Sequence, residues 1–184
     1  MPEPISPRHI IEFWYSERMR QCWFSSTPEL DAEIRSRYEN LWLQAGKGEL
    51  DEWKASPEGC LALVVVLDQF PLNMFRGEAK SFSTEQKAVA CSKYCISQGY
   101  DREIPQDRVA FLYMPLMHSE NLADQDLAVD LFEQADLPHN LRFARHHREL
   151  IRRFGRFPHR NPILGRDSSA EEIAYLNSRE AFLG

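Results

Sequence analysis

Residues 56–71 read SPEGCLALVVVLDQFP, and this segment separates an all-helical protein from one with a buried strand. Its continuous, β-branched run LALVVVL is compatible with a strand inside a sheet. The segment is long for such a strand, and Ser56 followed by Pro57 is the pair of residues that commonly opens a helix. We therefore predict a helix over 57–70 that is apolar on every side, lies in the core and ends before Pro71.

The same signals recur along the chain. Thr27 and Pro28 open a predicted helix over 28–45, whose apolar residues recur at helical spacing and which stops at Gly46. Other helices are predicted near 7–17, 83–99, 107–113 (cut off before Pro115), 120–135, 141–154 and 169–181, with capping boxes of Ser83 with Gln86 and Ser168 with Glu171. No segment alternates like a strand. The pattern predicts an all-α fold of about eight antiparallel helices in a single domain, 1–184.

Length and composition indicate an ordinary globular chain. With 184 residues, 43% of them hydrophobic, it is large enough to bury a core. Its longest apolar run is far shorter than the roughly 20 residues of a membrane-spanning helix, and the N-terminus lacks the features of a signal peptide. We therefore expect a cytoplasmic protein without membrane contact, whose four cysteines are free, buried thiols.

Positive charge is concentrated in one part of the chain. Residues 142–166 hold eight Arg, no Lys and one acid, a net charge of +7, whereas the whole chain carries −6. Arg without Lys favours bidentate recognition of phosphate or carboxylate. The charge of −13 on the rest of the chain opposes a polyanion lying across the molecule, which argues against nucleic acid as the partner.

Three polar clusters are candidates for a functional site: DQFPLNMFRG at 68–77, MPLMHSENLADQ at 114–125 and FGRFPHRNPILGR at 154–166. The first cluster has two interpretations. Asp68 and Gln69 either cap their helix or pair with an Arg inside the fold, or they form the wall of a ligand pocket. In the second case Asn73 and Arg76 belong to the same wall.

The second cluster contains a candidate acid–base pair, His118 and Glu120, after the predicted helix break at Pro115. In one interpretation His118 bonds a backbone carbonyl and Glu120 pairs with an Arg. In the other, Glu120 orients His118 as a general base. His159, in the third cluster, is the alternative acid–base group.

The third cluster contains RFPHRNP, residues 156–162, which turns at two prolines and is not helical. This stiff loop and the helix before it hold the residues that we expect to bind a phosphate or carboxylate: Arg153, Arg156, Arg160 and Asn161. The structural alternative is that the guanidiniums bridge helix C-terminal carbonyls and buried carboxylates, such as Asp68 or Glu120.

Metal binding is a further possibility to weigh. The sequence contains enough residues that could coordinate a metal: His118, Glu120, His146, His147 and His159. However, no zinc-type spacing occurs, and the positive charge of 142–166 repels a cation. We expect no metal and no cofactor, since the P-loop, nucleophile-elbow and dinucleotide patterns are all missing from the sequence. The reaction type, if there is one, stays open.

Several strings together carry a family resemblance. LDQFP.N.FRG, MPL.HSE and RFGRFPHRN..LGR, with IIEFWY near the start and SAEEIAYL near the end, resemble the bacterial family known as domain of unknown function 924. The resemblance covers nearly the whole chain in the family's order, and it implies a tetratricopeptide-like, solenoid-like arrangement of paired helices. Family members usually have Arg where this chain has Leu72, and Thr where it has Ser169.

Two functions remain open at this point. The first is a pocket rich in Arg and His that binds an anionic small molecule, with His118, Glu120 or His159 available for catalysis. The second is a scaffold that binds an acidic peptide or a protein, which the tetratricopeptide resemblance implies. Oligomeric state and ligand identity are not encoded in any of these patterns.

Overall fold

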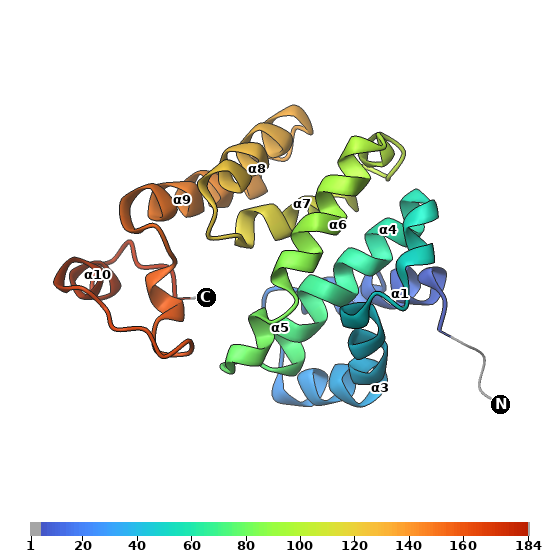
Figure 1. Ribbon diagram of the computed structural model, residues 1–184, viewed down its shortest axis with the longest axis horizontal. Helices are drawn as coiled ribbons and strands as arrows, with labels where there is room; N and C mark the ends of the chain where they lie inside the picture. Colours follow the sequence, from blue (N-terminus) through green and yellow to red (C-terminus); the bar gives the residue numbers. More distant parts are fainter. Residues whose placement is uncertain (1–4, 184) are drawn as a thin grey trace. The chain divides into compact units, whose positions relative to one another are not determined.

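The computed structural model describes residues 5–183, and every regular element within them is helical, which confirms the all-α prediction (Figure 1). The α-helices are α1 (Pro7–Trp14), α2 (Glu17–Arg20), α3 (Pro28–Lys47), α4 (Pro57–Val64), α5 (Phe70–Met74), α6 (Glu85–Ser97), α7 (Val109–His118), α8 (Leu122–Gln134), α9 (Pro138–Phe154) and α10 (Ala170–Leu176). Short helical turns lie between them: η1 (Asp51–Ala55), η2 (Val65–Gln69), η3 (Ala79–Phe82), η4 (Tyr100–Arg102) and η5 (Pro158–Arg160).

Three helices begin at the predicted caps. The side chains of Ser6, Thr27 and Ser56 each accept a hydrogen bond from a backbone amide in the first turn of α1, α3 and α4. The end of α3 differs from the prediction, because the helix passes through Gly46 and ends at Gly48. The φ of Gly48 is 83°, a left-handed conformation that glycine adopts without strain.

The predicted central helix is present and longer than expected. From α4 the chain continues through η2, a turn of π-helix, into α5. Every residue from Cys60 to Phe70 is buried, so this helix is enclosed on all sides, as its sequence indicates. It ends after Met74, and Pro71 lies inside it rather than beyond its end.

Pro71 does not end the helix because a residue outside it supplies the missing hydrogen bond. Proline lacks the N–H that would bond the carbonyl of Leu67, four residues earlier. The Thr84 hydroxyl donates to that carbonyl at 2.6 Å and accepts from Trp42 Nε1 at 3.0 Å. Thr84 is also the N-cap of α6, without a capping hydrogen bond from its side chain, so the predicted capping box that begins at Ser83 is wrong.

We expect Thr84→Val to lower the free energy of unfolding by about 1–2 kcal/mol, because it leaves the Leu67 carbonyl and the Trp42 N–H without partners in the core. Urea unfolding at 25 °C measures this change. Ser83→Ala is the control, since the Ser83 hydroxyl bonds only a local carbonyl at the surface, and it should change stability by less than about 0.5 kcal/mol. Equal losses in the two variants would contradict the role of Thr84.

A second proline also lies inside a helix. α7 runs through Pro115 to His118, so the predicted interruption at this proline is wrong. The Ser92 hydroxyl of α6 donates to the Leu112 carbonyl at 2.5 Å, in the turn that Pro115 disturbs. Because α7 continues past Pro115, His118 is the last residue of this helix rather than part of an irregular segment.

The last helix begins one residue later than predicted. Ser169, rather than Ser168, is the N-cap of α10 and forms a capping box with Glu172. The Ser168 hydroxyl instead accepts a hydrogen bond from Asn161 Nδ2 at 3.1 Å. α10 ends at Leu176, shorter than the prediction.

The described chain divides into two compact units. The first comprises residues 5–76 and 80–115, and in it α4 packs against α1 and α6. The second comprises 77–79 and 116–183, and in it α8 and α9 lie side by side (Figure 1). The single domain over 1–184 and the solenoid-like arrangement of helices stay predictions.

The structure also bears on the expectations about the cysteines and about membrane contact. Cys60, Cys91 and Cys95 are buried and all four cysteines are free, although Cys22 is partly exposed. No helix within residues 5–183 combines the length and the apolar character needed to cross a membrane.

Candidate functional site

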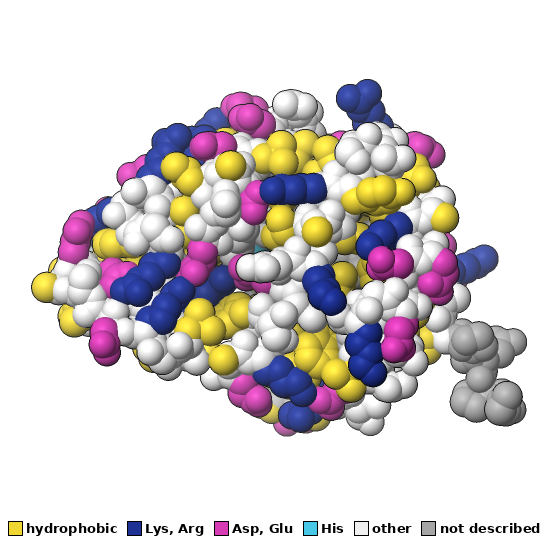
Figure 2. Space-filling view, in the orientation of Figure 1, with side chains coloured by type: hydrophobic (Ala, Val, Ile, Leu, Met, Phe, Trp, Pro, Cys, Tyr) yellow, Lys and Arg dark blue, Asp and Glu magenta, His cyan; other side chains and the backbone are white. Residues whose placement is uncertain are grey.

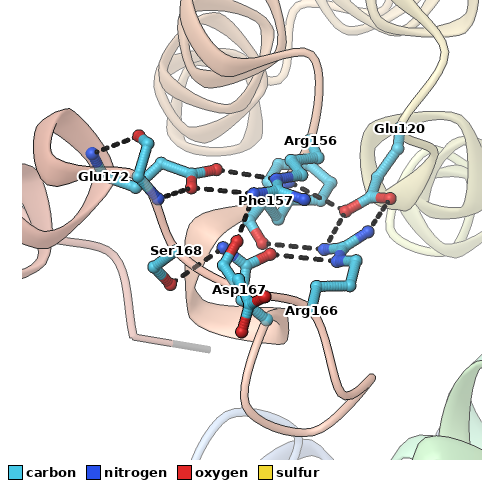
Figure 3. A network of polar contacts seen from close by, with 9 residues as sticks. Glu120, Arg156, Phe157, Arg166, Asp167, Ser168 and Glu172 are labelled. Atoms are coloured by element: carbon cyan, nitrogen blue, oxygen red, sulfur yellow. Dashed lines mark hydrogen bonds and ion pairs between the residues drawn. The ribbon is translucent and has the colours of Figure 1, made fainter.

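The RFPHRNP loop is anchored by an ion pair on each side (Figure 3). On one side Arg166 donates to both carboxylate oxygens of Glu120, at 2.7 and 2.9 Å. Glu120 also accepts from the backbone N–H of Phe157 at 2.8 Å. Burial disfavours the charge of Glu120, but the hydrogen bonds from Arg166 and Phe157 outweigh it and hold its pKa below the ordinary value. The predicted pairing of Glu120 with an Arg is therefore confirmed.

On the other side, Arg156 fastens the loop to α10. Its guanidinium donates to the two carboxylate oxygens of Glu172 at 2.7 and 2.9 Å and to the carbonyl of Asp167 at 2.7 Å. The hydrogen bond from Arg156 lowers the pKa of Glu172 to about 2. The Glu172 side chain is 3% exposed and that of Arg156 is 31% exposed, so the carboxylate end of this ion pair is buried.

Arg160 and Asn161 point into the second unit rather than to solvent. Arg160 is 6% exposed, and its Nη2 donates at 2.8 Å to the carbonyl of His118 at the C-terminal end of α7. Asn161 is fully buried and accepts from Arg166 Nε at 2.9 Å. Arg160 thus contacts a helix C-terminal carbonyl, and Arg166 contacts the carboxylate of Glu120. Both contacts are of the kind expected if the arginines have a structural role.

Four other arginines of α9 pair with acids: Arg145, Arg148, Arg152 and Arg153. Arg145 pairs with Glu133, and Arg153, a predicted ligand-binding residue, pairs with Glu171 at 2.8 Å. Over the face shown in Figure 2, Lys and Arg side chains lie next to Asp and Glu side chains. A surface hollow of about 360 Å³ is lined by Arg153, Phe154, Arg156, Ser169, Glu171 and Glu172. Both of its guanidiniums are already paired.

The first predicted cluster lies in the first unit. Asn73 Nδ2 and Arg76 Nε each donate to the carboxylate of Asp31 in α3, both at 2.8 Å. Gln69 donates to Asp68 at 2.5 Å, and both side chains are buried. Asn73 and Arg76 thus fasten α5 to α3. That these four residues line the same pocket as the third cluster stays a prediction.

Two histidines of the second unit are buried or half-buried: His159, which the sequence selects as an acid–base candidate, and His147, which it offers only as a metal ligand. His147 of α9 is 4% exposed, and within residues 5–183 neither of its ring nitrogens has a hydrogen-bond partner. Nδ1 of His159 is likewise buried without a partner. Both rings lie near Phe157, with ring centroids 5.3 and 5.7 Å away. Helical spacing from Ala144 would have placed His147 on the buried face of α9.

The environment of these histidines opposes a positive charge. Burial, and then the nearby charges of other histidines and Arg160, lower the pKa of His147 to about 3. Burial and the charge of Arg160 lower the pKa of His159 to about 4. Both imidazoles are therefore neutral at pH 7, where each carries one N–H donor and one acceptor nitrogen.

Metal coordination finds no support in the geometry. Across the described part of the chain, no group of three or more His, Cys, Asp or Glu side chains is arranged to hold a metal ion. His147 and His159 thus lie near the buried guanidinium of Arg160. Each neutral ring offers one N–H donor and one acceptor nitrogen.

Comparisons with known proteins place the chain in a family. Its residues 10–180 match the model of a family described as "Bacterial protein of unknown function (DUF924)". A search of curated proteins finds no match. A solved structure of a protein of unknown function from Agrobacterium tumefaciens, ATU0120, is 37% identical, with a TM-score of 0.88 over 93% of this chain and 96% of that one. Since the family model spans most of its length, the chain belongs to the bacterial family DUF924.

Proposed function

We propose that the second unit binds an anionic small molecule, a phosphate or a carboxylate, beside His147, His159 and Arg160. The observation that carries the proposal is His147, a buried side chain whose two ring nitrogens have no partner among the described residues. A buried polar group without a hydrogen bond costs about 1–3 kcal/mol of stability. Phe or Leu would fill this position at no such cost, so the imidazole fits a binding role better than a packing role.

The electrostatics of these groups favour an anionic ligand. The pKa values of His147 and His159 are low because burial and neighbouring positive groups disfavour the imidazolium. A bound anion would reverse the second cause and accept hydrogen bonds from the imidazole N–H groups. Arg160, which donates to the His118 carbonyl, adds a fixed positive charge at the same place. A cationic ligand would meet repulsion from the guanidinium of Arg160.

Catalysis is a separate question from binding. The carboxylate of Glu120 accepts from Arg166 and Phe157, which fits anchoring of the loop better than orientation of His118. Acid–base roles for His118, Glu120 and His159 therefore stay predictions. His159, half-buried and uncharged at pH 7, is the stronger of the two candidate histidines for contact with a ligand.

Isothermal titration calorimetry with inorganic phosphate and with acetate tests the proposal. The wild type should bind at least one of them, and His159→Ala should weaken binding by tenfold or more. His139→Ala is the matched control, because His139 is an exposed histidine of the same unit, in the first turn of α9. It should bind like the wild type. Binding of an acidic peptide but of neither anion would contradict this function and favour the scaffold.

The binding should also depend on pH. An anion that raises the pKa of His159 from about 4 toward its ordinary value binds together with a proton, so affinity rises as the pH falls. Sulfate is the suitable ligand, because its own charge is constant between pH 7 and 5. If the bound pKa approaches 6.5, linkage gives roughly twentyfold tighter binding at pH 5 than at pH 7. Affinity independent of pH would argue against contact with the histidines.

A further inference from the structure

The segment that follows α10 lies against the two histidines. The ring centroid of Phe182 is 4.5 Å from that of His147 and 5.1 Å from that of His159. Both pairs are close to edge-on, with interplanar angles of 74° and 84°, the arrangement that aromatic rings favour. Phe182 thus occupies a position bounded by both imidazoles, and it is only partly buried there.

The hydrogen bonds that attach this segment to α10 share one hydroxyl group. Tyr175 OH accepts the backbone N–H of Phe182 at 2.8 Å, donates to the carbonyl of Glu180 at 3.3 Å and lies 3.2 Å from Nε2 of His146. Among the described residues, no other hydrogen bond joins residues 179–183 to the helices before them. The neighbouring Leu183 is 71% exposed. Apart from these hydrogen bonds, the segment is held mainly by the packing of Phe182, which is only partly buried against the hydrophobic cluster of the unit. We therefore expect it to open at a lower free energy than the core of the unit does.

We infer that Phe182 occupies an aromatic subsite of the anion site, so that the ligand is an anion carrying a planar ring and the C-terminal segment competes with it. The inference rests on the proposed function. A ligand ring that displaces Phe182 regains the edge contacts with His147 and His159. Its anionic group then brings to the histidines and Arg160 the negative charge that Phe182 lacks.

Competition by the segment sets the apparent affinity. If the site is open in only a fraction of molecules, the apparent dissociation constant exceeds the intrinsic one by the inverse of that fraction. A change that removes the ring or loosens its tether should therefore tighten binding of a ligand with a ring. Inorganic phosphate does not need the ring position, and its affinity should not respond.

Calorimetry of the full chain with phenyl phosphate, inorganic phosphate and toluene tests the inference. Phe182→Ala should bind phenyl phosphate at least tenfold more tightly than the wild type, with the affinity for inorganic phosphate changed less than twofold. Tyr175→Phe keeps the ring of Tyr175 in the core, removes the tether together with the hydrogen bond to His146, and should give a gain of about threefold or more. It keeps the test valid if Phe182→Ala fails to fold. Leu183→Ala, at an exposed position, is the control and should behave like the wild type.

The outcomes distinguish failure of this inference from failure of the proposed anion-binding function. If phosphate binds and neither variant gains affinity for phenyl phosphate, Phe182 is only a packing residue and the inference is overturned. If toluene gains as much as phenyl phosphate, the substitution has merely opened an apolar cavity, which also overturns it. If neither the wild type nor any variant binds phosphate or acetate, the proposed function fails and the inference fails with it.

Discussion

Glu120→Ala is expected to lower the free energy of unfolding by about 2–3 kcal/mol. The substitution removes the acceptor of three hydrogen bonds, two from Arg166 and one from the Phe157 amide. It leaves a guanidinium that is 22% exposed without its carboxylate. Removing one partner of a fully buried pair costs about 3–5 kcal/mol, and the partial exposure of this pair reduces that figure. Urea unfolding measures the loss, and amide hydrogen exchange over 155–166 should show the loop opening first.

Glu133→Ala is the matched control for this prediction. Glu133 also pairs with an arginine, Arg145, but both side chains are more than half exposed. Exposed pairs contribute at most about 1 kcal/mol, so the control should lose little stability. If Glu120→Ala were as mild as Glu133→Ala, the RFPHRNP loop would not depend on the pair with Arg166.

The second large effect is a loss of stability in mild acid. His147 has a pKa of about 3 in the folded protein, below its ordinary value of 6.5. Between these values the unfolded chain binds a proton that the folded chain does not, so the free energy of unfolding falls as the pH drops below about 6.5. The loss from this residue approaches about 3 kcal/mol near pH 4. His159, with a pKa of about 4, adds to it in the same direction.

His147→Phe should remove much of this acid sensitivity. The ring keeps an aromatic shape beside Phe157 and Phe182 and no longer buries unbonded nitrogens. Stability at pH 7 should stay equal to that of the wild type or rise. Urea unfolding at intervals from pH 7 to pH 5 measures the slope, in a range above the ordinary pKa of carboxylates. The control, His139→Phe at an exposed position, should keep the wild-type slope. An unchanged slope in His147→Phe would show that His147 titrates normally.

The beginnings of helices could be predicted from sequence where the chemistry is local. Ser6, Thr27 and Ser56 cap helices through amides only three residues away, and each cap lies where its Ser-Pro or Thr-Pro pair predicts. The apolar run after Ser56 has the length of a helix, and burial on all sides follows from its composition.

The predicted ends were wrong where a residue from another element completes a helix. Pro71 and Pro115 normally end helices, but Thr84 and Ser92 donate to carbonyls in the turns that these prolines disturb. Those donors are distant in sequence, and their spacing to the prolines carries no signal. Thr84 also explains the failed capping box, because its hydroxyl is used by Leu67 and not by its own helix.

The candidate site was predicted by residue type but not by partner. Sequence reasoning selected Arg156 as a ligand-binding residue and Glu120 as an acid–base candidate, roles that stay predictions, and the structure pairs them with Glu172 and Arg166 within the fold. Which acid meets which arginine depends on long-range packing. His147 was considered only as a metal ligand, since its lack of hydrogen-bond partners arises from the packing of α9 against the loop and the C-terminal segment.

The titration of the histidine ring protons by NMR, with and without sulfate, tests the proposed anion site most directly. Spectra of His147→Phe and His159→Ala assign the two signals. In the absence of sulfate both residues should titrate well below 6.5, near 3 and 4. Saturating sulfate should raise the pKa of His159 by one unit or more. Identical curves for His159 with and without sulfate would contradict anion binding at these histidines.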